Sequence, residues 1–242
     1  MAEIAEWLDC IDEDTSDFSD IVSLTLGSET IKVKRCTKCC MIKPLSEFGR
    51  DQKGKDGYRY HCKSCKAESH ARYRKENPDK VMVYQQRRRA RKEGLPDDLT
   101  DEEWEQILSD FNERCALTGE KEDVDAEHFI PLAIHHGGTY VGNMFPMTGV
   151  LNSSKWMRNP FEWIKRPEVK EQVPAERWNA LIEYLAAQNG LTVDEFKDFV
   201  YWCFDNPRTL EQAKNDTKKG ITSLDLWRKA RFNHEISKGE TK

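Results

Sequence analysis

Two segments of the chain, one near its middle and one nearer its C-terminus, begin with the same pattern of polar and apolar residues. Thr100 is followed by Glu103, and Thr192 by Glu195, and after each pair apolar residues recur three and four positions apart. A threonine N-cap with glutamate at the third helical position is a capping box, so the pattern predicts a helix at each place. Helical spacing also extends over 174–188, and we expect the C-terminal half of the chain to be largely helical.

The N-terminal half has a different pattern. Residues 31–68 are turn-rich and contain most of the cysteines, and residues 68–92 contain strong helix formers interrupted once, at Asn77-Pro78. Because the residue before a proline disfavours the helical conformation, we predict two basic helical pieces there. Residues 1–30 show no sustained period and are expected to form a mobile acidic arm.

Charge is distributed unevenly along the 242 residues, although the net charge is only -5. Residues 1–30 hold nine acidic and no basic residues, whereas residues 31–95 hold twenty basic and seven acidic residues, a net charge of +13. A basic block of this size is typical of a surface that contacts a polyanion, because each neutralised phosphate releases counterions. We therefore expect DNA as a partner, with a solvated Lys/Arg-rich helix surface as the alternative.

Composition excludes several classes of protein. Charged residues make up 33% of the chain, the mean hydropathy is -0.81, and no apolar run approaches 18 residues. A transmembrane span is thus excluded, and the acidic start MAEIAEWLDCIDED makes a secretory signal unexpected. Five of the eight cysteines lie between positions 36 and 65, which favours a metal site in a reducing compartment over a disulfide framework. We expect a cytoplasmic location, in the bacterial host if the chain is phage-encoded.

Two CxxC pairs predict a structural zinc site. Cys36 and Cys39 form the first pair, Cys62 and Cys65 form the second, and 22 residues separate them. Two tight turns that each present two thiolates can complete a tetrahedral shell of four sulfurs, which Zn²⁺ prefers. Cys40 could replace Cys39 as a ligand, although the spacing favours Cys39.

A second group of residues has the composition of a hydrolytic site. Runs of β-like composition at 124–130 and 139–147 carry Glu127-His128 near the end of the first, and Asn152 follows the second. Phosphodiester hydrolysis needs a base for an in-line water and a cation for the charge on phosphate and leaving oxygen. A carboxylate, an imidazole and an amide in this order can hold Mg²⁺ beside a general base.

This segment resembles the HNH (ββα-metal) nucleases in the order and spacing of its functional positions. The resemblance implies that His128 is the general base, that Glu127 and Asn152 bind the catalytic Mg²⁺ or Mn²⁺, and that Asn143 braces the two strands. Asn143 and Asn152 follow His128 by 15 and 24 residues, similar to the HNH domains of CRISPR nucleases. The CxxC pairs with PLSEF between them also resemble the zinc modules of phage, prophage or mobile-element HNH and junction-resolving endonucleases.

The chain departs from the family pattern in two respects. Glu127 replaces the usual aspartate, which leaves the metal preference open. Many relatives hold the motif with a second zinc, but the matching positions here are Cys115, Thr118, Thr148 and Leu151, so a second four-sulfur site is excluded. We expect apolar packing of Leu117, Phe145 and Met147 in its place.

The loop between the two predicted strands contains two adjacent histidines, His135 and His136. We interpret them as exposed imidazoles of a flexible loop. A second phosphate contact or an alternative metal ligand is the other interpretation.

The sequence thus predicts an α+β protein that acts as a metal-dependent DNA endonuclease. A branched-DNA resolving nuclease and a non-catalytic zinc-containing DNA-binding protein are the alternatives. The expected segments are the acidic arm (1–30), a treble-clef or zinc-ribbon-like module (31–68), a basic helical linker (69–95), an HNH nuclease domain (96–165) and a C-terminal helical domain (166–242). The expected DNA contacts are Lys53, Lys55, Arg59, Arg72, Arg74, Arg87, Arg88, Arg89, Arg91 and, one turn after Asn152, Lys155.

Overall fold

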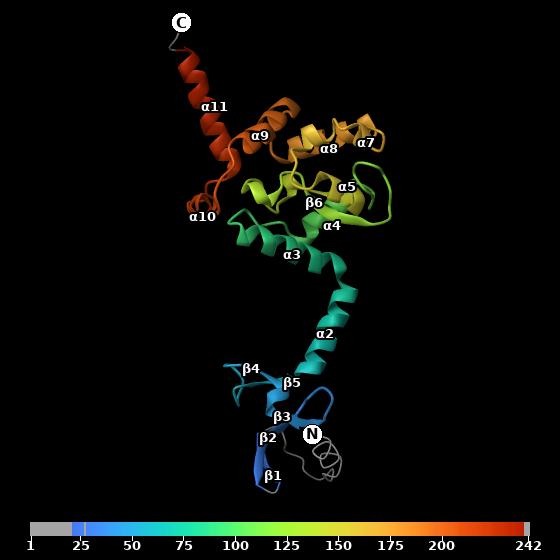
Figure 1. Ribbon diagram of the computed structural model, residues 1–242, viewed down its shortest axis with the longest axis vertical. Coiled ribbons are helices and arrows are strands. Elements are labelled where there is room, and N and C mark those ends of the chain that lie inside the picture. The colour runs from blue at the N-terminus through green and yellow to red at the C-terminus, as the bar shows by residue number, and fades with distance from the viewer. Residues whose placement is uncertain (1–20, 27, 240–242) are drawn as a thin grey trace. The chain divides into compact units, whose positions relative to one another are not determined.

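The computed structural model describes residues 21–26 and 28–239 (Figure 1). Small antiparallel sheets and many helices make the chain an α+β protein, as the sequence predicts. It divides into two compact units, the first ending at Pro78 and the second beginning at Asp79. Among the helices that the structure describes, none is long and apolar enough to cross a membrane.

The first unit contains two small antiparallel sheets followed by a helix. One sheet has the order β1-β2-β3, with Val33 of the central strand opposite Val22 and Pro44, and the other pairs β4 with β5. The elements are β1 (Val22–Leu26), β2 (Glu29–Arg35), β3 (Ile42–Pro44), a 3-10 turn (Leu45–Glu47), β4 (Phe48–Arg50), β5 (Tyr58–Cys62) and α2 (Lys63–Glu76).

The predicted acidic arm, residues 1–30, extends too far along the chain, because a β-strand forms before its end. Residues 22–26 pair with residues 29–33 in a hairpin, so this stretch belongs to the first unit. The alternation of Val22, Leu24 and Leu26 with polar residues is the strand signal that accounts for it. Residues 1–20 of the predicted arm lie outside the described residues.

The second unit is a β-hairpin enclosed by helices. Both predicted capping boxes are present, since the Thr100 and Thr192 hydroxyls accept from the backbone N–H of Glu103 and Glu195 and each glutamate accepts in return. The elements are α3 (Pro78–Lys92), α4 (Asp101–Asp110), β6 (Val124–His128), two 3-10 turns (Leu132–Ile134 and Val141–Asn143), β7 (Met144–Thr148), α5 (Gly149–Lys155), α6 (Pro160–Trp163), α7 (Pro167–Lys170), α8 (Ala175–Gln188), α9 (Val193–Asp205), α10 (Leu210–Lys218) and α11 (Ser223–Gly239).

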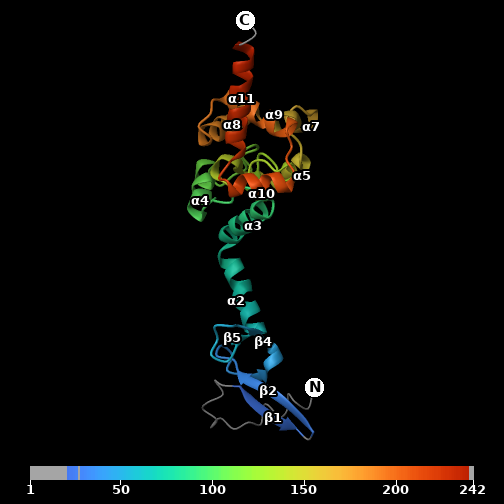
Figure 2. The same cartoon turned by 90° about the vertical axis from the view of Figure 1, so that its left-hand side faces the viewer.

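The hairpin β6–β7 separates two clusters of buried side chains. Phe145 and Met147 of β7 belong to the larger cluster, with residues of α8 and α9, whereas Met144 and Ala126 pack with residues of α3 and α4. Figures 1 and 2 show α8 and α9 on one side of the hairpin and α3 on the other. Alternate residues of a strand point to opposite faces, so β7 is buried on both faces, whereas Asp125 of β6 is exposed.

Two of the predicted segment boundaries, after residues 95 and 165, fall between residues that pack in the same hydrophobic cluster. The larger cluster runs from Cys115 to Trp227, so the C-terminal helices and the hairpin share one core across residue 165. Val83 of α3 packs with Leu99 and Trp104, so α3 is part of this unit and not of a linker.

Candidate metal centre and active site

The four predicted cysteine ligands lie together in the first unit. The Sγ atoms of Cys36, Cys39, Cys62 and Cys65 are all within 4.8 Å of one another. A tetrahedral zinc with Zn–S bonds of about 2.3 Å places its sulfurs about 3.8 Å apart, so the cluster fits this ion with little adjustment. The alternative ligand Cys40 is exposed and lies outside the group.

Local backbone structure presents these sulfurs. Cys36 directly follows β2 and starts a tight turn in which Cys40 N–H donates to the Cys36 carbonyl (2.8 Å), while Cys62 ends β5 at the start of α2. Burial alone would raise the pKa of Cys36, but backbone N–H groups of Cys39, Cys62 and Lys38 outweigh it and lower that pKa to about 6. The first thiolate is therefore stabilised by the fold itself.

His128 ends β6 and is enclosed by the hairpin and α3. Its side chain is 3% exposed, and its Nε2 lies 2.8 Å from the Thr139 hydroxyl oxygen. Burial, with smaller contributions from the charges of Arg89 and Lys155, lowers the pKa of His128 to about 3. The imidazole is therefore neutral. Its pKa lies well below the ordinary value of about 6.5 that the sequence alone suggests.

Hydrogen bonding fixes which ring nitrogen of His128 carries the proton. The single hydroxyl hydrogen of Thr139 is donated to the carbonyl of Gln86 on α3 (3.1 Å), so its oxygen accepts from His128 Nε2–H. Nδ1 keeps its lone pair, and within the described residues it has no hydrogen-bond partner. The arrangement leaves Nδ1 as the atom that can accept a proton.

Glu127 forms a buried ion pair with Lys155 of α5. The Lys155 Nζ lies 2.7 Å from a Glu127 carboxylate oxygen, and the two side chains are 1% and 14% exposed. Nζ has no other partner in the described part of the chain. Burial lowers the pKa of Lys155, and Glu127 opposes this shift. The predicted contact of Lys155 with a DNA phosphate is thus replaced by an internal contact with Glu127.

Asn143 holds the connection between the two strands. Its side-chain oxygen accepts from Ile130 N–H (2.7 Å), and its amide nitrogen donates to the carbonyls of Ile130 (3.1 Å) and Gly138 (2.8 Å). Gly137, at φ +69°, lies against this amide, where a Cβ would approach the nitrogen to 2.7 Å. Asn143 is fully satisfied and buried, so it acts as the expected brace and not as a group that touches a substrate.

Asn152 is partly exposed on α5, three residues before Lys155. Residues three apart share one face of a helix, so the Lys155–Glu127 contact directs that face of α5 towards the end of β6. Trp163 fixes the helix from the other side, because its indole N–H donates to the Ser154 hydroxyl (3.0 Å).

Glu127 and Asn152 are the predicted ligands of a catalytic cation. They carry the carboxylate and amide oxygens that Mg²⁺ and Mn²⁺ prefer, and an ion held by two protein groups would keep several waters. No cluster of three His, Cys, Asp or Glu side chains with metal-binding geometry occurs in the described residues apart from the cysteines. Lys155 already neutralises Glu127, so an ion would compete with an internal ammonium.

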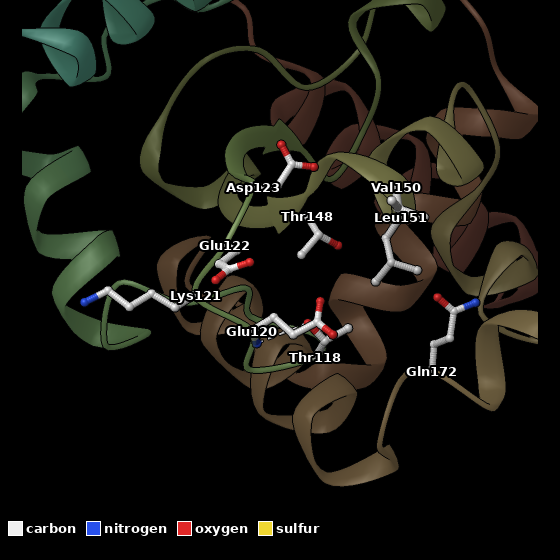
Figure 3. A pocket seen from close by; sticks show the side chains of 9 residues that line it. All are labelled: Thr118, Glu120, Lys121, Glu122, Asp123, Thr148, Val150, Leu151 and Gln172. Carbon is white, nitrogen blue, oxygen red and sulfur yellow. Dashed lines mark hydrogen bonds between the residues drawn. The ribbon is translucent and has the colours of Figure 1, made fainter.

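Three of the positions that match the second zinc site of the family line a pocket in this chain. Thr118, Thr148 and Leu151 border a hollow of about 720 Å³ together with Glu120, Lys121, Glu122, Asp123, Val150 and Gln172, as Figure 3 shows. The expected apolar packing beside it is present, since Leu117, Phe145 and Met147 are all buried in the larger cluster. The pocket has an acidic lining that borders the N-terminal end of α5.

The two loop histidines are not the exposed imidazoles that we expected. His136 is fully buried, where its Nδ1 accepts from the Ser223 hydroxyl (3.0 Å) and its Nε2 donates to the Asn206 carbonyl (2.7 Å). His136 therefore ties the loop to the segments at 206 and 223 and has no ring nitrogen left for a phosphate or a metal. His135 is half-buried, and its Nδ1 lies 3.4 Å from a Glu93 carboxylate oxygen without a hydrogen bond.

The predicted DNA contacts divide into exposed and internally paired residues. Arg87 donates to the Asp97 carbonyl and Arg91 pairs with the Asp97 carboxylate (both 2.5 Å), so both hold the connection after α3. Arg89 donates to the Gln86 side chain (3.0 Å). The side chains exposed to solvent are Lys53, Lys55, Arg59, Arg72, Arg74, Arg88, Arg89 and, beside its Asp97 partner, Arg91.

No family model, curated protein or solved structure matches the chain. The function of the candidate site is therefore inferred from its geometry alone. Sequence reasoning missed Thr139 and Gln86, because their role arises only when α3 packs against the strand connection.

Proposed function

We propose that this chain is a metal-dependent DNA endonuclease of the HNH (ββα-metal) type with one structural zinc. The observation that carries the proposal is the Gln86–Thr139–His128 chain of hydrogen bonds, which holds a neutral imidazole with a free Nδ1 beside Glu127. A neutral imidazole held in one tautomer, with its other nitrogen unengaged, can accept a proton as a general base. The strand, strand, helix order around it supports the same family.

The residues divide the reaction between them. His128 Nδ1 takes a proton from a water aligned opposite the leaving 3′ oxygen, and Thr139 stabilises the resulting imidazolium by accepting from Nε2–H. Glu127 and Asn152 would hold the divalent cation, which neutralises charge on the phosphate and the leaving oxygen when bound. The exposed arginines and lysines of α2 and α3 would bind the DNA backbone and make affinity depend on salt.

The decisive experiment incubates supercoiled, linear and four-way-junction DNA with Mg²⁺, Mn²⁺ or EDTA and compares the products. We expect metal-dependent cleavage that His128→Ala lowers by at least about 10²-fold, because a base acts on the transition state. Binding of His128→Ala to DNA in EDTA should stay within a few fold of the wild type.

A matched control is His61→Ala, which removes an exposed histidine of the first unit. It should cut as the wild type does. Full activity of His128→Ala would remove this residue from the mechanism, and activity in EDTA would remove the metal.

The second candidate is a zinc-containing DNA-binding protein without nuclease activity. The buried Lys155 ammonium at Glu127 favours it, since a permanent internal counterion can take the place of a catalytic cation. DNA binding without cleavage under any metal condition would select this candidate.

A further inference from the structure

Trp156 differs from the other tryptophans of the described chain. Its side chain is 64% exposed, while Trp104, Trp163 and Trp227 are buried and Trp178 and Trp202 are partly buried. Its ring makes no ring–ring, cation or hydrogen-bond contact with any residue that the structure describes. The neighbouring Met157 is also exposed. A large apolar surface is thus left open immediately after α5.

The backbone holds Trp156 in a conformation that a large side chain rarely adopts. Its φ and ψ are 47° and -122°, and Arg158 N–H donates to the Lys155 carbonyl (3.0 Å) across it. These values describe the second residue of a type II′ turn, a position that favours glycine. A tryptophan there is strained, and such outliers cluster at sites that use the side chain.

The position of Trp156 relates it to the candidate active site. It follows Asn152 by four residues, and its backbone N–H donates to the Asn152 carbonyl (2.9 Å). Four residues of helix advance about 6 Å, close to the separation of neighbouring nucleotides along a strand. A base beside a phosphate bound at Asn152 is therefore within reach of the ring.

Charge along α5 favours nucleic acid at this end of the helix. Residues 149–159 contain no acidic residue, and Arg158 is exposed just after Trp156, whereas Lys155 is already paired with Glu127. The N-terminal end of α5 borders the pocket with Glu120, Glu122 and Asp123 (Figure 3). Phosphates are repelled from the acidic end. The combination of an exposed ring, an adjacent methionine and a cationic turn is typical of surfaces that stack on bases.

We propose that Trp156 stacks on a base that is unpaired next to the cleaved phosphate, so that the substrate class is DNA with an interrupted helix, such as a bubble, flap or branch. Bases inside a continuous duplex are stacked on both sides and offer no free face to a protein ring. This inference rests on the proposed nuclease function, whose site supplies the neighbouring phosphate.

The test measures binding in EDTA, where cleavage is not required. One fluorescein-labelled duplex and the same duplex with a central bubble are titrated with the full chain, and a second bubble carries 2-aminopurine as a stacking probe. The variants are Trp156→Gly, Trp156→Phe and Phe232→Ala. Glycine fits the turn without strain, phenylalanine keeps an aromatic face, and Phe232 is a control with 63% exposure on α11.

We expect the wild type to bind the bubble at least about fivefold more tightly than the duplex and to change the 2-aminopurine fluorescence. Trp156→Gly should lose both effects while melting at the same or a higher temperature. Trp156→Phe should keep most of the preference, and Phe232→Ala should keep all of it.

A preference that survives in Trp156→Gly, or a wild type that binds both DNAs equally, overturns this inference and leaves the nuclease proposal standing. Binding to neither DNA overturns both. A ring-dependent preference without cleavage in Mg²⁺ or Mn²⁺ supports stacking and refutes the nuclease.

Discussion

The Nζ of Lys155 lies 2.7 Å from the carboxylate of Glu127, and both side chains are shielded from solvent. The pair joins α5 to the last residues of β6, where the candidate base also lies. A charge left alone at such a place is costly, so the pair can be tested by removing one partner at a time.

Lys155→Met should destabilise the second unit by about 3 kcal/mol in urea unfolding, because it leaves the Glu127 carboxylate buried without a partner. The double variant with Glu127→Gln should recover part of this loss. The control is Lys165→Met, which breaks the exposed pair of Lys165 with Glu162 and should cost less than about 1 kcal/mol. Equal losses of unfolding free energy in the two single lysine variants would show that the buried pair stabilises the unit no more than the exposed pair.

Thr139→Val should lower cleavage by at least about tenfold with little change in DNA affinity. Valine has the shape of threonine without the hydroxyl, so His128 loses the acceptor that fixes its tautomer. Thr139→Ser should restore the rate, and ¹⁵N spectra of the His128 ring should show Nε2–H in the wild type and a tautomer mixture in the valine variant. An unchanged ring spectrum in Thr139→Val would contradict the positioning role.

The full chain should bind one zinc that elemental analysis detects after washing with a weak chelator. Cys36→Ser or Cys62→Ser should lose the metal and unfold the first unit, because metal binding supplies folding energy that so small a core lacks. The second unit shares no ligand with this site and should keep its unfolding transition. Cys40→Ser is the control and should retain zinc. Two tightly bound zincs per chain would contradict the single site.

His136 should make the second unit less stable as the pH falls from about 6.5 to about 4. Burial, with the nearby charges of Arg208 and His135, lowers its pKa to about 4, while the Asn206 carbonyl and Asp216 oppose the shift. The unfolded chain takes up a proton below about 6.5 and the folded chain does not, so acid favours unfolding across this window by about 3 kcal/mol.

The measurement is urea unfolding at several pH values, followed by tryptophan fluorescence. His136→Gln should be less stable at pH 7.5 and should show a smaller loss of stability between pH 6.5 and 4 than the wild type. Parallel pH curves for the two proteins would exclude His136 as the titrating group.

Features that depend on neighbouring residues in the chain could be predicted from the sequence. The helix starts at Thr100 and Thr192 and the break at Pro78 follow from local hydrogen bonds and from the proline ring, and all three are present. The CxxC spacing likewise predicts the cysteine cluster, because each pair needs only one tight turn.

Features that depend on contacts between distant segments could not be predicted. Lys155 has the spacing of an exposed helical residue, but the packing of α5 against β6 buries it. His135 and His136 precede two glycines, which suggests a flexible loop. His136 is instead held by Asn206 and Ser223, which lie 70 and 87 residues further along the chain.

The burial of β7 on both faces has a consequence for motion within the candidate site. Backbone amides of β7 and of the β6 residues paired with it exchange with solvent only when most of the unit unfolds, so they should be among the slowest in hydrogen exchange. His128 and its tautomer-fixing threonine are attached to this slowly opening hairpin, whereas Asn152 and Trp156 lie on α5 and the turn after it. Local fluctuations can therefore move Asn152 and Trp156 while His128 keeps its geometry. Under the proposed function, substitutions in α9 that loosen the shared core should reduce cleavage without touching any residue of the site.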